Sequence, residues 1–416
     1  MKAIFQRLTL LFVVSFFILY QTTEAQPGCT DPQAINFDPS ATENDGTCEY
    51  PTTTYSLEQV ANLSANLAEA SGLAFFENRL FTHLDGGNPD QLYEIDTLNG
   101  SIKQTFTIPL ADNLDWEDLA EDEEHLYIGD FGNNFGNRTD LRIYKILKSD
   151  FLSGTISPEL IEFSYSDQTD FTSLPNNNDY DCEAFFFWND SLHLFSKNWV
   201  NLKTRHYVLP VTPGQHTAQL RDSLDADGLI TAADISTDGS AVLIGYNTAN
   251  APLVEAFLWL LFDFNGSQIL SGNKRRISLG SVAFTSQLEG ITFRDSTSGF
   301  ICAEEFSVLP PKLMEFDISQ WLGNPVPAFE AFDQSSIKIF PNPAQEIIQI
   351  NFTTPPTHTP HVQIIDSGGR KVLERFLKNS FPVTETSLNI SHFPPGAYWI
   401  FIHYENQFLT KLIHKQ

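Results

Sequence analysis

Five segments of the chain repeat one pattern, and this repeat limits the possible folds more than any other feature. Each has a small or acidic pair, a hydrophobic residue, a polar turn and a strand such as HLYIGD, and a further strand such as LRIYKI follows. The segments start at Ala70, Trp116, Cys182, Ala232 and Leu288, at intervals of 46, 66, 50 and 56 residues. Such intervals suit one four-stranded propeller blade per repeat, whereas an array of immunoglobulin-like sandwiches needs about 100 residues per unit. The repeat predicts an all-β chain with a β-propeller over residues 55–321, of five blades, with room for a diverged sixth.

Acidic residues recur at one position of the repeat. In a propeller the first strand of each blade lines the central channel, so equivalent positions face one axis. The repeat places in this column Ser71, Glu117, Glu183, Ala233 and Glu289, with Asp118 and Asp234 one position later and Glu69 just before. Carboxylates that converge on an axis repel one another unless a cation joins them or their pKa values rise.

The column is expected to bind calcium. Oxygen ligands without Cys or His favour Ca²⁺ over zinc. We expect Glu117, Glu183 and Glu289 to be the main ligands, followed by Asp118, Asp234 and Glu69. Adjacent residues of a strand point to opposite faces, so Asp118 and Asp234 would both join the ring of Glu117 only through a bulge. The alternative is a solvated acidic channel without an ion.

The N-terminus has the pattern of a secretory signal. Lys2 and Arg7 precede the apolar run Leu8–Tyr20, and Thr23-Glu24-Ala25 is a plausible cleavage site. The run is too short to span a bilayer. We expect residues 1–25 to be a signal peptide and the mature chain to have no membrane span.

A short cysteine-bounded segment, residues 26–52, follows the signal. In an exported chain Cys29 and Cys48 are expected to form a disulfide. Between them, oxygen ligands at short intervals suggest a second metal loop, although not with EF-hand spacing: Asp31, Asn36, Asp38, Asn44 and Asp45. The segment resembles thrombospondin type 3 repeats, and the alternative is an acidic loop closed by the disulfide alone. Cys182 and Cys302 fall inside predicted strands and are expected to be buried rather than paired.

Residues 337–416 form a separate block. They carry 7 Lys and Arg against 5 Asp and Glu, a charge of +2, whereas the rest carries 17 against 47, a charge of −30. This break marks a domain boundary, with residues 322–336 as the linker. Alternating apolar residues and turn sequences in the block predict a small antiparallel sandwich of about seven strands. The acidic body disfavours nucleic acid and anionic membranes as partners.

The C-terminal block resembles the type A sorting domain of the type IX secretion system of Bacteroidetes. The resemblance is carried by four motifs in order: Pro341-Asn342-Pro343, the turn from Asp366 to Arg370 with Gly369, the PPGAY sequence with Gly396 and Tyr398, and the terminal Lys411 and Lys415. It implies passage through the periplasm, recognition by the outer-membrane translocon and removal by a sortase. The mature protein would then be released or joined to surface lipopolysaccharide, and so be extracellular or on the outer cell surface.

The repeat region resembles the extracytoplasmic calcium-binding propellers of the SdiA-regulated group and, more distantly, esterase-like phytase and strictosidine-synthase-like propellers. The resemblance implies a calcium ion in the channel but no particular reaction. Two functions stay open: a module that binds a glycan or peptide, and a calcium-dependent hydrolase of esters, lactones or phosphoesters. For the hydrolase, the candidate polar residues lie at blade ends: Asp130, Asn133, Asn134, His83 and His125. The sequence contains no nucleophile elbow, HExxH, P-loop or dinucleotide fingerprint.

Overall fold

A computed structural model describes residues 25–249, 254–322, 337–352, 361–366, 370–376, 385–404 and 407–416. The chain divides into two compact units, Met1–Trp321 and Leu322–Gln416, and each is described by itself. The predicted signal peptide up to residue 24, residues 323–336 of the predicted linker and Gly369 lie outside the described residues.

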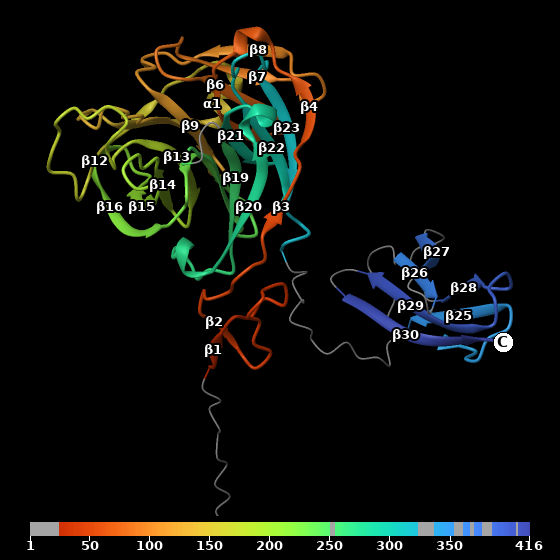
Figure 1. The fold of residues 1–416 in the computed structure, drawn as a ribbon. Coiled ribbons are helices and arrows are strands. Elements are labelled where there is room, and N and C mark those ends of the chain that lie inside the picture. Colours follow the sequence, from red (N-terminus) through yellow and green to blue (C-terminus); the bar gives the residue numbers. More distant parts are fainter. Residues whose placement is uncertain are drawn as a thin grey trace, which may run out of the picture. The chain divides into compact units, whose positions relative to one another are not determined.

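The first unit is a five-bladed β-propeller in the part of the chain that the structure describes (Figure 1). Each blade has four antiparallel strands, and the first strand of each is innermost. Blade 1 consists of β5 (Ala70–Phe76), β6 (Arg79–Leu84), β7 (Gln91–Ile95) and β8 (Ile102–Thr107). Blade 2 consists of β9 (Trp116–Glu121), β10 (His125–Asp130), β11 (Arg142–Leu147) and β12 (Glu159–Tyr165). Blade 3 consists of β13 (Cys182–Trp188), β14 (Ser191–Ser196), β15 (Thr204–Pro210) and β16 (Gly214–Leu224).

The last two blades complete the ring. Blade 4 consists of β17 (Leu229–Ile235), β18 (Ala241–Asn247), β19 (Glu255–Phe262) and β20 (Asn273–Ser281). Blade 5 consists of β21 (Leu288–Phe293), β22 (Ser298–Ala303), β23 (Lys312–Asp317) and, outermost, β4 (Glu58–Asn62). The inner strands contact one another in the closed order β5, β9, β13, β17, β21 and back to β5.

Strand pairing between distant segments holds the ring closed. The outermost strand of blade 5, β4, precedes blade 1 in the sequence and pairs antiparallel with β23, so both ends of the unit share one sheet. The outer strands of blades 2 and 3, β12 and β16, pair in parallel and join these blades into one sheet. A two-residue strand, β3 (Thr53–Thr54), adds to the outer edge of blade 4 beside β20.

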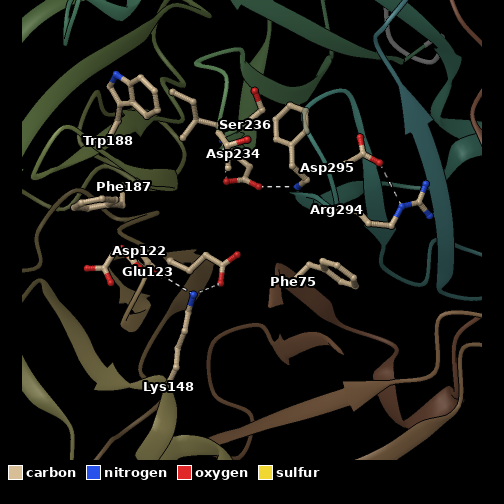
Figure 2. Close-up of a pocket in the computed structure, with 14 residues that line it drawn as sticks. Phe75, Asp122, Glu123, Lys148, Phe187, Trp188, Asp234, Ser236, Arg294 and Asp295 are labelled. Atoms are coloured by element: carbon tan, nitrogen blue, oxygen red, sulfur yellow. Dashed lines mark hydrogen bonds and ion pairs between the residues drawn. The ribbon is translucent and has the colours of Figure 1, made fainter. Parts of the chain in front are cut away.

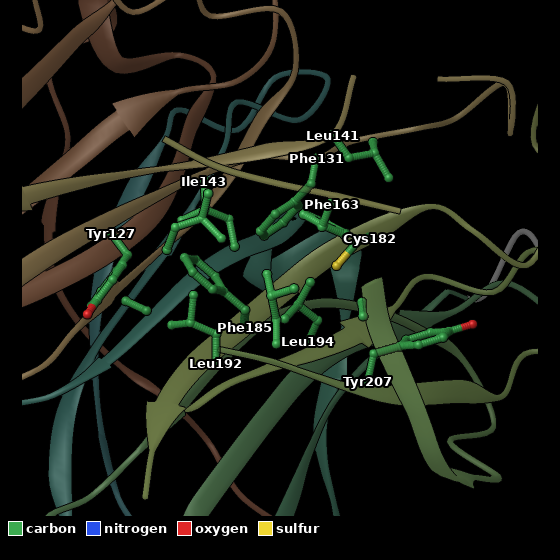
Figure 3. Close-up of a cluster of buried hydrophobic side chains, with 14 of the residues drawn as sticks. Tyr127, Phe131, Leu141, Ile143, Phe163, Cys182, Phe185, Leu192, Leu194 and Tyr207 are labelled. Atoms are coloured by element: carbon green, nitrogen blue, oxygen red, sulfur yellow. The ribbon is translucent and has the colours of Figure 1, made fainter. Parts of the chain in front are cut away.

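Large apolar side chains fill the space between neighbouring blades. Between blades 2 and 3, Phe131, Ile143, Phe185 and Leu194 belong to one buried cluster (Figure 3). The rings of Phe131 and Phe185 meet edge to face with centroids 5.0 Å apart. Sheets packed face to face lie about 10 Å apart, which explains the abundance of Phe in this chain.

The cysteine-bounded segment docks against blade 4. Cys29 and Cys48 form the expected disulfide, and β1 (Pro27–Gly28) pairs with β2 (Glu43–Asn44). Arg275 of β20 donates to Gln33 Oε1 at 2.7 Å and lies over the ring of Tyr50. Cys182 and Cys302 are buried and unpaired, as predicted.

Helices contribute little to either unit. The described residues form α1 (Lys148–Ser153), α2 (Val282–Thr285) and the single-turn η1 (Ala65–Leu67) and η2 (Ile269–Ser271). Within these residues no helix has the length and apolar character needed to cross a membrane.

The second unit is the predicted small sandwich. One sheet has the order β24–β25–β28 and the other β27–β26–β29–β30. Their bounds are β24 Ile337–Phe340, β25 Ile347–Phe352, β26 His361–Asp366, β27 Lys371–Phe376, β28 Glu385–Asn389, β29 Gly396–Tyr404 and β30 Gln407–Lys415. Ile348, Ile350, Val362 and Ile400 belong to one buried core drawn from both sheets.

Candidate metal centre

A β-bulge occurs near the start of the inner strand in every blade. The pairing skips one residue in each: Gly72, Glu117, Glu183, Thr231 and Glu289. A bulged residue is left out of the ladder and its side chain is re-aimed, so these five positions occupy equivalent places around the axis. The predicted column was therefore correct for the three glutamates. It was wrong in blade 4, where Thr231 and not Ala233 occupies the position. In blade 1 it was wrong by one residue, because Gly72 and not Ser71 is at the bulge.

The three glutamates meet in one small cavity on the axis. Its volume is about 110 Å³. The described lining residues are Ser71, Asp85, Glu117, Asn134, Glu183, Lys197, Gln287, Glu289 and Glu304. Asp85, Lys197 and Glu304 each directly follow the second strand of their blade, so strand ends and bulges together supply the lining.

Lys197 pairs with one of the glutamates. Its Nζ lies 2.6 Å from Glu183 Oε2, and both side chains are buried. Burial acts to lower the pKa of the ammonium, but the acidic groups around it, Glu183 first among them, together outweigh burial and hold the pKa of Lys197 well above its usual value. Glu183 therefore has an internal counter-ion, which the alignment of the five repeats did not predict.

Among the residues that the structure describes, the other carboxyls of the cavity make no ion pair with a basic side chain. Burial, followed by repulsion from Glu183, raises the pKa of Glu117 well above its usual value. Burial raises the pKa of Glu289 to about 7, against the opposing effect of Lys197. Burial and then Glu289 raise the pKa of Glu304 to about 8. The cavity is thus an environment in which a bound cation would favour the ionised carboxylates.

Three carboxylates come close enough to share one ion. One oxygen each of Asp85, Asp115 and Glu117 lie within 4.8 Å of one another. Ligand oxygens at 2.3–2.6 Å from one Ca²⁺ are at most about 5 Å apart, so the spacing fits that ion. Burial, and next Asp85 and Asp181, raise the pKa of Asp115 to about 7.

Two glycines allow the chain to approach these carboxylates. A Cβ at Gly132 would collide with the carboxylates of Glu117 and Asp115, and a Cβ at Gly86 would collide with Asp115 Oδ1. The donor set and the surrounding backbone therefore fit a hard divalent cation.

Sequence reasoning missed Asp85 and Asp115. Asp115 lies two residues before Glu117, as Asp181 lies two before Glu183, and each aspartate directly precedes the inner strand of its blade. This Asp-x-Glu spacing in two blades was the signal that could have pointed to Asp115. Asp85 stands in the loop after β6, where no periodic pattern indicates it.

Asp118 and Asp234 do not join the cavity and instead connect blades. Asp118 Oδ2 accepts from the backbone N–H groups of Phe185 at 3.1 Å and Ala233 at 3.2 Å. Asp234 Oδ2 accepts from the N–H of Phe293 at 2.7 Å. Each carboxylate thus satisfies a backbone donor of another blade near the axis. Glu69 accepts from Asn88 Nδ2 at 2.7 Å and does not line the cavity.

Most of the polar residues considered for hydrolysis are also engaged elsewhere. His83 is fully buried, and burial lowers its pKa to about 4. Asp130 pairs with Arg138 and Arg142, each at 3.0 Å. His125 bonds to Asp122 at 3.1 Å, and Asn133 Nδ2 donates to the carbonyl of Tyr180. Of this group, Asn134 lines the cavity.

The oxygen ligands of the N-terminal segment are engaged in hydrogen bonds within the segment itself. Asp31, Asp38 and Asp45 each accept from a backbone N–H two residues further on and so close their own turns. Asn44 closes a turn with Gly46, and Asn36 bonds to Thr47 and Glu49. A second calcium site there stays a prediction without geometric support.

The sorting-motif residues stabilise the second unit. Asn342 Nδ2 donates to the carbonyl of Leu412, and its Oδ1 accepts from the N–H of His414, which fixes the last strand. Arg370 Nε lies 3.2 Å from Asp366 Oδ2 across the turn. Tyr398 Oη donates to the carbonyl of Pro394, while Gly396 begins β29 and Lys411 lies in β30.

Comparisons with known proteins identify the C-terminal unit. Residues 338–416 match the family described as "Secretion system C-terminal sorting domain". No curated protein matches the chain. Among solved structures, a gluconolactonase from Xanthomonas campestris matches at 13% identity, with TM-score 0.34, over 60% of this chain and 72% of that one. An exo-β-1,3-galactanase from Phanerochaete chrysosporium matches at 12% identity, with TM-score 0.38, over 90% and 98%. Values this low carry no information on function.

Proposed function

We propose that this protein is a cargo of a type IX secretion system in a Bacteroidetes bacterium and acts outside the cell as a calcium-binding propeller. The match of residues 338–416 to a secretion sorting domain supports the export. The signal-like N-terminus and the disulfide between Cys29 and Cys48 agree with an oxidising destination.

The observation that carries the calcium proposal is the meeting of Asp85, Asp115 and Glu117 within 4.8 Å. These residues hold the ion, and Glu289 and Glu304 add negative charge nearby. The ion offsets the repulsion between carboxylates and thereby holds blades 1 and 2 together at the axis. This arrangement suits a rigid ligand-binding module.

The alternative is a calcium-dependent hydrolase. Its proposed proton-transfer residues are occupied, since Asp130 is bound by two arginines and His83 is enclosed. We therefore favour the module. A panel of esters, lactones and phosphoesters, assayed with calcium and with chelator, separates the two functions: turnover that chelator abolishes would support the hydrolase.

Thermal unfolding tests the calcium proposal. A ligand present at 100 times its Kd stabilises the folded state by about 2.7 kcal/mol. Calcium should raise the Tm of the wild-type protein, and Asp115→Asn should remove most of this rise because it removes a ligand charge. Glu123→Gln, a change at an exposed position, should keep it. A wild-type Tm that calcium leaves unchanged would refute the proposal.

A further inference from the structure

We propose that the pocket at the opposite end of the propeller channel binds a neutral saccharide of one or two sugar units. The pocket has a volume of about 470 Å³, within the range of small-molecule sites. All five inner strands contribute to it: Phe75 from β5, Glu121 from β9, Phe187 and Trp188 from β13, Asp234 and Ile235 from β17, and Phe293 from β21.

The pocket is separate from the metal centre. Glu117 and Glu121 lie near opposite ends of β9, and Glu289 and Phe293 near opposite ends of β21. Four residues of a strand span roughly 13 Å. The saccharide site therefore does not depend on a bound cation.

Aromatic side chains form the walls of the pocket. Phe75 and Phe187 lie on opposite sides of it, and Trp188 lies above Phe187 in Figure 2. The indole Nε1 of Trp188 donates to the carbonyl of Gly266 at 3.0 Å, which fixes the ring. The negative face of an aromatic ring attracts the polarised C–H groups of a sugar, and rings that are already fixed lose little entropy on binding.

The carboxylates of the pocket are mostly satisfied by the protein itself. Asp234 accepts from the N–H groups of Ile235 and Phe293. Asp122 accepts from Tyr127 Oη at 2.6 Å. Glu121 Oε2 lies 2.7 Å from Lys148 Nζ. Protein groups thus occupy these carboxylates, and the five acidic residues of the lining against two basic ones disfavour an anionic ligand.

Groups at the rim offer both donors and acceptors. The exposed Glu123 carboxylate makes no hydrogen bond to the residues that the structure describes. The Arg294 side chain is 37% exposed, and Thr237 is exposed in the turn after β17. Mixed donors and acceptors beside aromatic walls suit a ligand with hydroxyl groups and apolar C–H faces, and they do not suit a purely apolar ligand.

Saturation-transfer NMR and calorimetry with the purified protein test the site. The probes are cellobiose, xylobiose, galactobiose and maltose, with spermidine as a cationic comparator. We expect at least one disaccharide to bind with its ring C–H protons saturated, and spermidine not to compete. Failure of all four disaccharides to bind, or displacement of the bound sugar by spermidine, would overturn the proposal.

Variants in one exposed turn locate the binding. Thr237→Arg places a long side chain over the pocket and should weaken binding by at least about tenfold. Asp238→Arg adds the same side chain at the next position, which does not line the pocket, and should leave affinity within about twofold. Phe187→Leu keeps apolar volume but removes a ring, and it should also weaken binding. Equal affinity in Thr237→Arg and wild type would contradict the assignment.

Discussion

At the residue scale, carboxylates near the axis of the propeller occur in two different environments. Lys197 neutralises Glu183 directly at 2.6 Å. In the described part of the chain Asp85, Asp115 and Glu117 make no ion pair with a basic side chain, and one oxygen of each lies within 4.8 Å of the others. A buried carboxylate without a partner either takes up a proton or binds a cation. Protonation of the carboxylates is favoured at low pH, whereas cation binding is favoured at high pH.

The metal-free protein should lose stability as pH rises. The folded-state pKa values of Asp115, Glu289 and Glu304 are about 7, about 7 and about 8. Unfolded carboxyls titrate near pH 4, so between about pH 4 and pH 8 the folded state binds more protons than the unfolded state. Stability from these groups is therefore complete below about pH 4 and lost as pH rises through 7 to 8.

Calcium should reverse this loss, because it favours the ionised carboxylates. We expect calcium to raise the Tm by more at pH 8 than at pH 5, measured by thermal unfolding against metal-free buffer. Proton release on binding at pH 7, measured by calorimetry in two buffers of different ionisation enthalpy, should accompany it. An equal Tm shift at both pH values would show that the ion binds elsewhere.

At the scale of elements, the sequence predicted the inner strands better than the sheet edges. The glutamates of β9, β13 and β21 were aligned correctly because each lies near the start of an inner strand that is followed by a similar second strand. Blade 4 was misaligned by two residues because it has Thr231 at the bulge, and Asp234 resembled Asp118 without occupying its position. The pairings of β4 with β23 and of β12 with β16 join segments far apart in sequence, so no local pattern could predict them.

The N-terminal segment should stabilise blade 4 as well as itself. Removing the disulfide by Cys29→Ser with Cys48→Ser should cost the segment about 3 kcal/mol by the chain-entropy model. Because Arg275 contacts Gln33 and Tyr50, hydrogen exchange should become faster in β3 and β20. Exchange in β9 and β10 of blade 2 serves as the internal control and should not change. Unaltered exchange in β20 would mean that the docking contributes nothing to blade 4.

At the scale of the whole molecule, charge and packing both separate the two units. The last 80 residues, with a charge of +2, have a buried core of their own, and the ring of blades closes without them through β4 and β23. The boundary near residue 322 was visible in the sequence because composition changes there. The identity of a bound ligand could not be predicted from the sequence, because the binding site is formed by side chains that five separate strands bring together.

Removal of residues 337–416 should leave a folded propeller that is not exported. The truncated protein should keep the Tm of the propeller, because that unit has its own core, and should accumulate in the periplasm. Cell fractionation with immunoblotting measures its location, and the full-length protein is the control. Normal amounts of truncated protein in the medium or on the cell surface would contradict the role of the C-terminal unit.

The central claim is that one cation lies among Asp85, Asp115 and Glu117, and anomalous diffraction from a calcium-soaked crystal tests it most directly. We predict one strong peak on the propeller axis, about 2.3–2.6 Å from an oxygen of each of these three residues. The peak should be absent from crystals of Asp115→Asn. Crystals of the wild-type protein with no peak in this cavity, or with a peak that persists unchanged in Asp115→Asn, would contradict the claim.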